Sequence, residues 1–300
     1  MLKKLIAFLL DLFNNKSNSS ITDLDIEEKD LIQDLYTKEE QEEEVVIEKE
    51  IVKENVPEVK EKPLKIKKHF LSKDSYFPVN NKKEWLFLHH TAGWENPFKV
   101  INSWDRSPIK IATEFLIGGV NVVNQNSEYD GVVVKAFPKG GYAWHLGVGR
   151  RKVHTHSVGV ELNSFGYLTK GGYTKKVNKK RVWVDKDSEK FYTYTGREVH
   201  NDQVIELEKE FRGYKYWHNY SPAQLKALKK LIYHIRDEEG IDITKGIVEL
   251  IKEKGAHEAF DFCNLKYVED NAGLWLHTNV QKGKYDLYPH PELIKLLLSL

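Results

Sequence analysis

GLWLHTNVQKGKYDLYP, residues 273–289, places a histidine at the end of a short apolar run and a carboxylate one loop later. The apolar run is typical of a buried strand, which would carry His277 at its tip. A polar loop follows with Lys284 and Asp286, and Pro289 prevents a helix from starting at once. A histidine and a carboxylate held in this way can be two ligands of an open metal site, so we expect a third ligand at the end of another strand.

A second apolar run ends in a pair of histidines. Residues 85–93, WLFLHHTAG, lead from an expected strand directly into His89 and His90. Because side chains alternate along a strand, these two histidines point to opposite faces. A third apolar segment, SVGVEL at residues 157–162, carries Glu161 and lacks strict alternation, which indicates a short strand buried on both faces.

Together the three segments resemble the type 2 family of zinc-dependent N-acetylmuramoyl-L-alanine amidases, which includes phage endolysins and the peptidoglycan recognition proteins. That family carries, in this order, a strand ending in His-x-Ser/Thr, a strand of the form Ser-Val/Ile-Gly-Val/Ile-Glu-Leu, and a late histidine followed by Lys-x-Asp/Cys. All three patterns occur here in the same order. The resemblance implies an α/β fold with a central mixed β-sheet flanked by helices. It also implies hydrolysis of the amide between N-acetylmuramic acid and L-alanine in peptidoglycan.

The resemblance also implies a metal site with one zinc ion per chain. Its ligands would be His89, His277 and Asp286, with an open position for water. The family places the ligand first in the His-x-Thr triplet, which favours His89, and His90 is the alternative. A structural role remains open for Asp286, because aspartate also stabilises turns.

Two further residues are expected to take part in catalysis. Glu161 would act as a general base and then as a proton donor to the leaving amine. Lys284 matches the family lysine two residues before the third ligand, and its ammonium group would stabilise the oxyanion. The alternatives are a paired structural carboxylate for Glu161 and an ordinary surface lysine for Lys284.

Three residues are candidates for substrate binding: His145, Trp94 and His90. The segment AWHLG at residues 143–147 resembles a family segment that lines the groove, so His145 would either contact substrate or support a ligand. Trp94 follows the histidine pair closely and would either stack on a sugar or peptide or pack in the core.

The net charge of +1 conceals an acidic leader and a basic body. Residues 1–65 hold 10 Lys and 17 Asp or Glu, whereas the rest of the chain holds 36 Lys or Arg and 28 Asp or Glu. A basic body suits an anionic partner such as a bacterial wall polymer or nucleic acid. The chain contains no nucleic-acid-binding signature, so we expect peptidoglycan as the partner and no nucleic acid.

The single cysteine, Cys263, excludes an intramolecular disulfide, and we expect it to be a small buried residue. The sequence also contains no Gly-x-Ser-x-Gly nucleophile elbow, no His-Glu-x-x-His helix and no phosphate-binding loop. These absences exclude the corresponding hydrolase and nucleotide-binding classes.

The composition predicts three parts. Residues 1–20 form a short apolar or amphipathic segment, residues 21–65 an acidic linker that is largely disordered, and residues 66–300 the catalytic domain. Insertions are expected near 165–216 and 238–272. Residues 1–13 are too short to span a bilayer. Three roles remain open for them: an interfacial helix that contacts a membrane surface, a weak secretion signal or anchor, or a helix that docks a partner.

Several elements can be expected from the local pattern. Strands are predicted at 84–89, 112–119, 129–137 and 158–162, and a surface hairpin within 165–200. Helices are predicted at 96–104, 221–235, 243–254 and 290–300. The best defined of these elements is the helix at 221–235, because Ser221 can cap it and Pro222 occupies its first position.

These inferences predict a monomer that acts on the bacterial cell wall. It would be a phage-encoded, endolysin-like protein made in the host cytoplasm, or a protein secreted or membrane-associated through its N-terminal segment. Two alternatives are a peptidoglycan-binding module without catalysis and a phage structural component that carries an amidase-like domain.

Overall fold

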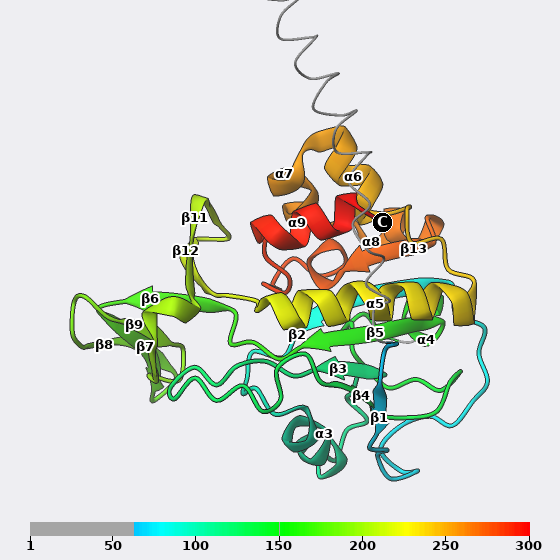
Figure 1. Ribbon diagram of the computed structural model, residues 1–300, viewed down its shortest axis with the longest axis horizontal. Helices are drawn as coiled ribbons and strands as arrows, with labels where there is room; N and C mark the ends of the chain where they lie inside the picture. The colour runs from blue at the N-terminus through cyan, green and yellow to red at the C-terminus, as the bar shows by residue number, and fades with distance from the viewer. Residues whose placement is uncertain (1–62, 150) are drawn as a thin grey trace, which may run out of the picture. The chain divides into compact units, whose positions relative to one another are not determined.

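The computed structural model describes residues 63–149 and 151–300 (Figure 1). These residues belong to one unit, Pro63–Leu300. The predictions for residues 1–20 and for all but the end of the linker 21–65 lie outside the described residues. Within the described part of the chain, no helix is long and apolar enough to cross a membrane.

A six-stranded sheet in the order β1-β4-β3-β5-β2-β13 forms the centre of the domain. Its strands are β1 (Ile66–Lys68), β2 (Trp85–His90), β3 (Phe115–Ile117), β4 (Val133–Lys135), β5 (Ser157–Leu162) and β13 (Gly273–Leu276). Strands β3, β5, β2 and β13 are parallel to one another, whereas β4 is antiparallel to β3. With helices packed on it, this mixed sheet confirms the predicted fold class.

The helices are α3 (Pro97–Asp105), α4 (Lys152–Thr155), α5 (Pro222–Glu239), α6 (Ile247–Lys254), α7 (Ala256–Asp261), α8 (Leu265–Asp270) and α9 (Pro291–Leu298), with short 3₁₀ turns η2 (Asn201–Gln203) and η3 (His277–Asn279). Helix α5 lies along the central sheet, and α6 to α9 gather near β13 (Figure 1). The expected cap is present, because the Ser221 hydroxyl accepts from the backbone N–H of Gln224. Gly240 ends the helix in the left-handed region, at φ 72°.

Alternation along β3 and β4 divides the core into two clusters on opposite faces of the sheet. Phe115 and Val133 pack in the cluster that includes α5, whereas Leu116 and Val134 pack with Ile101 of α3. Glu161 and His89 belong to the same face of the sheet as α3. Leu116, which packs with α3, is the register partner of Glu161, and Glu161 is the register partner of His89.

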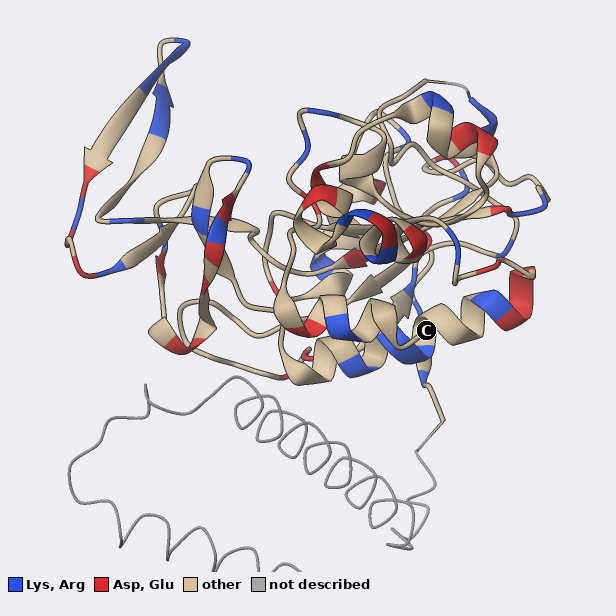
Figure 2. Cartoon of the chain, turned by 90° about the horizontal axis from the view of Figure 1, so that it is seen from above, with Lys and Arg blue, Asp and Glu red and all other residues tan. Residues whose placement is uncertain are grey.

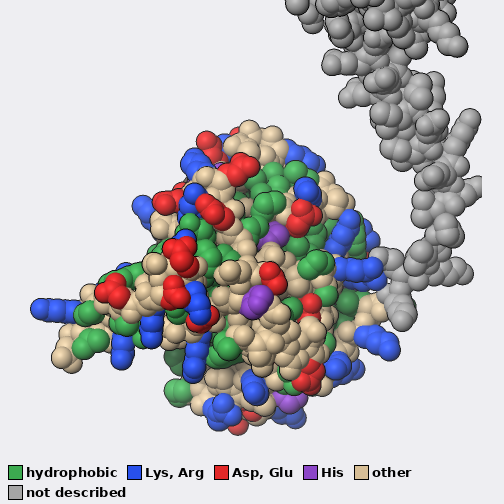
Figure 3. Space-filling view, turned by 60° about the vertical axis from the view of Figure 1, so that its left-hand side comes forward, with side chains coloured by type: hydrophobic (Ala, Val, Ile, Leu, Met, Phe, Trp, Pro, Cys, Tyr) green, Lys and Arg blue, Asp and Glu red, His purple; other side chains and the backbone are tan. Residues whose placement is uncertain are grey.

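A second sheet occupies the region where an insertion was predicted. It is antiparallel in the order β10-β9-β6-β12-β11. Its strands are β6 (Tyr167–Lys170), β9 (Phe191–Thr193), β10 (Glu198–Val199), β11 (Val204–Phe211) and β12 (Tyr214–His218), and the separate hairpin consists of β7 (Gly172–Val177) and β8 (Lys180–Asp185). The hairpin carries several Lys and Arg residues at and beside its turn (Figure 2), and basic side chains project from the part of the surface that extends to the left in Figure 3.

The structure differs from the sequence-based expectation at several points. Cys263 is exposed rather than buried, because it lies in the short link between α7 and α8. Strand β3 is shorter than the predicted 112–119, and the helix expected at 243–254 begins only at Ile247. The second sheet extends to His218, beyond the expected hairpin, because its pairings join segments far apart in sequence.

Candidate metal centre

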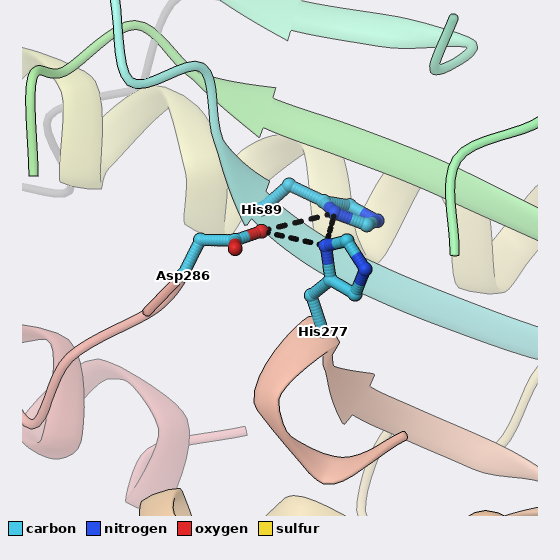
Figure 4. Close-up of side chains that lie close together, drawn as sticks. All are labelled: His89, His277 and Asp286. Atoms are coloured by element: carbon cyan, nitrogen blue, oxygen red, sulfur yellow. Dashed lines mark hydrogen bonds and ion pairs between the residues drawn. The ribbon is translucent and has the colours of Figure 1, made fainter. Parts of the chain in front are cut away.

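Three buried side chains converge where the parallel strands β2 and β13 end (Figure 4). His89 is the fifth residue of β2, His277 begins the turn after β13, and Asp286 lies in the loop that follows. The Nδ1 atoms of the two histidines are 2.9 Å apart. Asp286 Oδ2 lies 3.2 Å from the first and 2.8 Å from the second. The structure thus brings together the three residues predicted as ligands, and their binding of a metal stays a prediction.

The donor set fits a metal ion. Three mutual contacts join these atoms, but two imidazole nitrogens can supply at most two hydrogens, and an ionised carboxylate supplies none. One cation among them would satisfy all three lone pairs. Two nitrogens and one carboxylate oxygen are a common ligand set for catalytic zinc, and ligands of a tetrahedral zinc lie roughly 3.3 Å apart. The observed spacing is close to this value.

The protonation states also suit a metal. Burial, followed by the charge of His277, lowers the pKa of His89 to about 4. For Asp286, burial opposes ionisation, but the charge and hydrogen bonds of His277 and His89 outweigh it and hold its pKa well below the usual range. A neutral imidazole and an ionised carboxylate are the forms that bind zinc.

The second histidine of the pair belongs to the opposite face of β2. His90 Nδ1 lies 3.0 Å from the hydroxyl of Tyr220, next to helix α5. Its ring packs against Gly166, where a Cβ atom would come within 2.5 Å of Nε2. His89 and not His90 therefore contributes to the cluster of three.

A cleft of about 410 Å³ opens over the cluster on the α3 side of the sheet. Its walls come from α3, from the second sheet and from the loop 284–286, and they include Trp104, Tyr167 and Tyr194. Ligands of open α/β sheets bind outside the carboxyl ends of the strands, and this cleft has that position.

Glu161 and Lys284 line this cleft together with the cluster. Glu161 lies beside His89 in register on the neighbouring parallel strand, so both side chains share one face. Its Oε2 atom is buried and has no hydrogen-bond partner among the described residues. Burial, reinforced by the charge of Asp286, raises the pKa of Glu161 well above its ordinary value, and Lys284 opposes this effect.

His145 and Trp94, both predicted to bind substrate, occupy different surroundings. His145 lines the cleft, and its Nδ1 is 3.0 Å from Nε2 of His89. Trp94 is 40% exposed and packs edge-on against Phe165, at 5.2 Å between ring centroids. Trp94 is not part of the cleft wall, so its predicted contact with substrate stays a prediction.

Arg212, in the β11–β12 turn, is a residue that the sequence reasoning missed. Its guanidinium donates to the backbone carbonyl of Lys284 and contacts those of Thr278 and Lys282 at 3.5 and 3.4 Å. It also bonds Asp261 at 2.8 Å. Arg212 thus holds the loop that carries Lys284 and Asp286. The sequence signalled only a turn here, through Gly213.

A larger hollow of about 720 Å³ lies between α5 and α9. It is lined by side chains that include Lys229, His290 and Lys295. We assign the functional site to the smaller cleft, because only that cleft contains His89, His277 and Asp286.

Comparisons with known proteins give matches among solved structures only. No family model matches the chain, and no curated protein matches it. The endolysin N-acetylmuramoyl-L-alanine amidase LysCS from Clostridium intestinale URNW is 12% identical with a TM-score of 0.41, over 80% of this chain and 98% of that chain. PlyL is 10% identical with a TM-score of 0.39, over 74% of this chain and 86% of that chain.

A third similar structure is the complex of the amidase AmiD from E. coli with anhydro-N-acetylmuramic acid-L-Ala-D-gamma-Glu-L-Lys. It is 16% identical with a TM-score of 0.29, over 57% of this chain and 48% of that chain. At such identities and TM-scores the function of this chain has to be argued from its own residues.

Proposed function

We propose that this protein is a zinc-dependent amidase that hydrolyses an amide bond of peptidoglycan. The observation that carries the proposal is the convergence of His89, His277 and Asp286 at the floor of a cleft that Glu161 and Lys284 also line. Metal-assisted amide hydrolysis needs these parts: a three-residue ligand set, a proton carrier and a cation for the oxyanion.

The metal would be held by two imidazole nitrogens and one carboxylate oxygen from His89, His277 and Asp286. When bound, zinc supplies a Lewis acid that polarises a carbonyl and makes water more acidic. Glu161 would take the proton from the attacking water. Its raised pKa suits a carboxylate that must hold this proton before passing it to the leaving amine.

Lys284 would donate to the oxygen that becomes negative when the carbonyl is attacked. Its side chain lines the cleft near Asp286, two residues away on the same loop, and Arg212 fixes the backbone of this loop. The aromatic side chains Trp104, Tyr167 and Tyr194 in the cleft wall offer apolar surfaces for a sugar or a peptide.

We assign the scissile bond, between N-acetylmuramic acid and L-alanine, from the resemblance of the three sequence motifs to the type 2 amidases. The same motifs support the bacterial wall as the place of action and an endolysin-like role. The cleft itself would accept another amide of the wall equally well, so the products must be identified.

The test compares the full-length protein with its His277→Ala variant. We expect about one zinc per chain in the wild type by metal analysis, and new L-alanine amino termini when purified walls are digested. Both should be lost in the variant. A wild-type protein that binds walls but takes up no zinc and releases no amine would refute the proposal and leave a peptidoglycan-binding module.

A further inference from the structure

The two histidines of the candidate metal centre both direct Nδ1 towards Asp286. A neutral imidazole carries one N–H group and one lone pair. Nδ1 can therefore bind a metal only when the hydrogen is on Nε2, and the group that Nε2 contacts decides which form is stable.

The partner of His277 fixes its form directly. Nε2 of His277 lies 3.2 Å from the backbone carbonyl oxygen of Leu146. A carbonyl oxygen can only accept a hydrogen bond, so the hydrogen is on Nε2 and the lone pair is on Nδ1.

The partner of His89 is another histidine, so the direction of this bond depends on what lies behind it. Nε2 of His89 is 3.0 Å from Nδ1 of His145, and Nε2 of His145 is 2.9 Å from the hydroxyl of Ser157. The Ser157 hydroxyl donates its only hydrogen to the backbone carbonyl of His154, at 3.0 Å.

When a cation among His89, His277 and Asp286 takes up the lone pairs that face it, these contacts allow one consistent arrangement of hydrogens. The Ser157 oxygen accepts from Nε2–H of His145, so the lone pair of His145 is on Nδ1. That lone pair accepts from Nε2–H of His89, which leaves Nδ1 of His89 free for a metal.

We propose that the adjacent residues His145 and Leu146 set the tautomers of both metal-binding histidines, with Ser157 fixing the direction of the chain through His145. His145 is then a positioning residue and not a contact for substrate. This inference rests on the proposed zinc site, and it assigns roles to His145 and Ser157 that the chemistry of the cleft alone does not require.

The surroundings of His145 hold its ring in place. Its backbone N–H donates to Nε2 of His154 at 2.9 Å. The ring lies against Gly159, where an added Cβ would come within 3.0 Å of Nδ1 of His145 and within 2.8 Å of Cγ2 of Thr113. The glycine of the SVGVEL strand therefore provides the space that His145 occupies beside His89.

The test uses the full-length protein with three variants. Ser157→Ala removes the hydroxyl that fixes His145, so that His145 can donate through Nδ1 and move the hydrogen of His89 to its Nδ1. His145→Leu removes the acceptor, whereas His145→Gln restores one through its side-chain carbonyl. Thr155→Ala is the matched control, because its hydroxyl bonds His156 at 2.8 Å and does not contact the cluster.

Two measurements are needed, and neither depends on catalysis. Long-range ¹H–¹⁵N spectra of the metal-free protein show which ring nitrogen carries the hydrogen, and in this state Asp286 competes for a hydrogen on Nδ1 of both histidines. In Ser157→Ala the share of the hydrogen on Nε2 of His89 should fall relative to the wild type, whereas that on Nε2 of His277 should stay the same. Competition with a chelator should show zinc binding weakened about 10- to 100-fold in Ser157→Ala and His145→Leu. His145→Gln and Thr155→Ala should stay within a few-fold of wild type.

Equal tautomer populations of His89 in the wild type and in Ser157→Ala would overturn the inference. So would Ser157→Ala and His145→Leu variants that fold and keep wild-type zinc affinity. These outcomes are distinct from failure of the proposed function, because the spectra report the tautomers even if the protein binds no zinc or cleaves no wall.

Discussion

The position of the loop that carries Asp286, the proposed third metal ligand, should depend on Arg212. Replacing it in an Arg212→Met variant preserves the aliphatic length and removes every donor. The guanidinium side chain is 10% exposed, and it donates to the carbonyl of Lys284, which would lose this partner.

The size of the effect follows from the quality of the contacts. A hydrogen bond from a charged donor contributes about 1.5–3 kcal/mol. The contacts to Thr278 and Lys282, at 3.5 and 3.4 Å, are long and add little. The pair with Asp261 is half exposed on the carboxylate side and contributes below about 1 kcal/mol. We therefore expect a loss of about 2 kcal/mol, which is roughly a 30-fold weaker zinc affinity if the loop carries the whole cost.

The assay is the zinc dissociation constant, measured by competition with a chelator, together with urea unfolding of the metal-free protein. Arg151→Met is the control. Arg151 also pairs with a carboxylate, that of Glu269 at 3.1 Å, but its side chain is 51% exposed and this pair does not involve the loop. If Arg212→Met binds zinc within twofold of wild type and unfolds at the same urea concentration, Arg212 does not hold the loop and the reasoning fails.

Three further predictions concern catalysis, metal removal and pH. Glu161→Gln should lower the rate of wall hydrolysis by about 10²- to 10⁴-fold and leave the zinc content unchanged, because Glu161 is not one of the three ligands. Removing zinc by dialysis against a chelator should lower the midpoint of thermal unfolding, since zinc present at about 1,000 times its Kd stabilises the folded state by about 4.1 kcal/mol. Burial lowers the pKa of His218 to about 3, so between this value and about 6.5 the unfolded chain binds the extra proton. The free energy of unfolding should therefore rise with pH in this range, by up to about 1.4 kcal/mol per pH unit, and less steeply in His218→Asn.

Each of these predictions has an outcome that would contradict it. Glu206→Gln, on the exposed side of β11, should keep full activity, and an active Glu161→Gln variant would place the general base elsewhere. Thermal unfolding that does not change on zinc removal and return would contradict a metal held by buried ligands. An equal pH slope in the wild type and in His218→Asn would show that His218 does not contribute to it.

The parts of the fold that the sequence predicts well are those fixed by local pattern. The apolar runs before His89 and His277 predict buried strands, and both strands are present. The helix after Ser221 is predicted by a capping residue, a proline and an apolar stripe. Local pattern fails for β11, because half of its residues are charged and exposed and its pairing with β12 depends on the folded chain.

The site shows the same division. Spacing and residue type bring His89, His277 and Asp286 to attention, because ligand side chains must be of these types. The roles of His145 and Arg212 depend on which atoms face which in three dimensions. The motif around His145 left two interpretations open. Arg212 had no recognisable motif, since its partners in the loop are backbone carbonyls.

The parallel pairing of β2 with β13 also determines when the candidate metal centre can form during synthesis. Trp85 pairs with Gly273, so one edge of β2 stays unpaired until the ribosome has made a strand nearly two hundred residues later. Until then its apolar WLFL run has an open edge, a situation that slows folding and invites binding by chaperones. A nascent chain possesses His89 long before it possesses His277 and Asp286. The candidate metal centre therefore cannot form before residues 277–286 have been made.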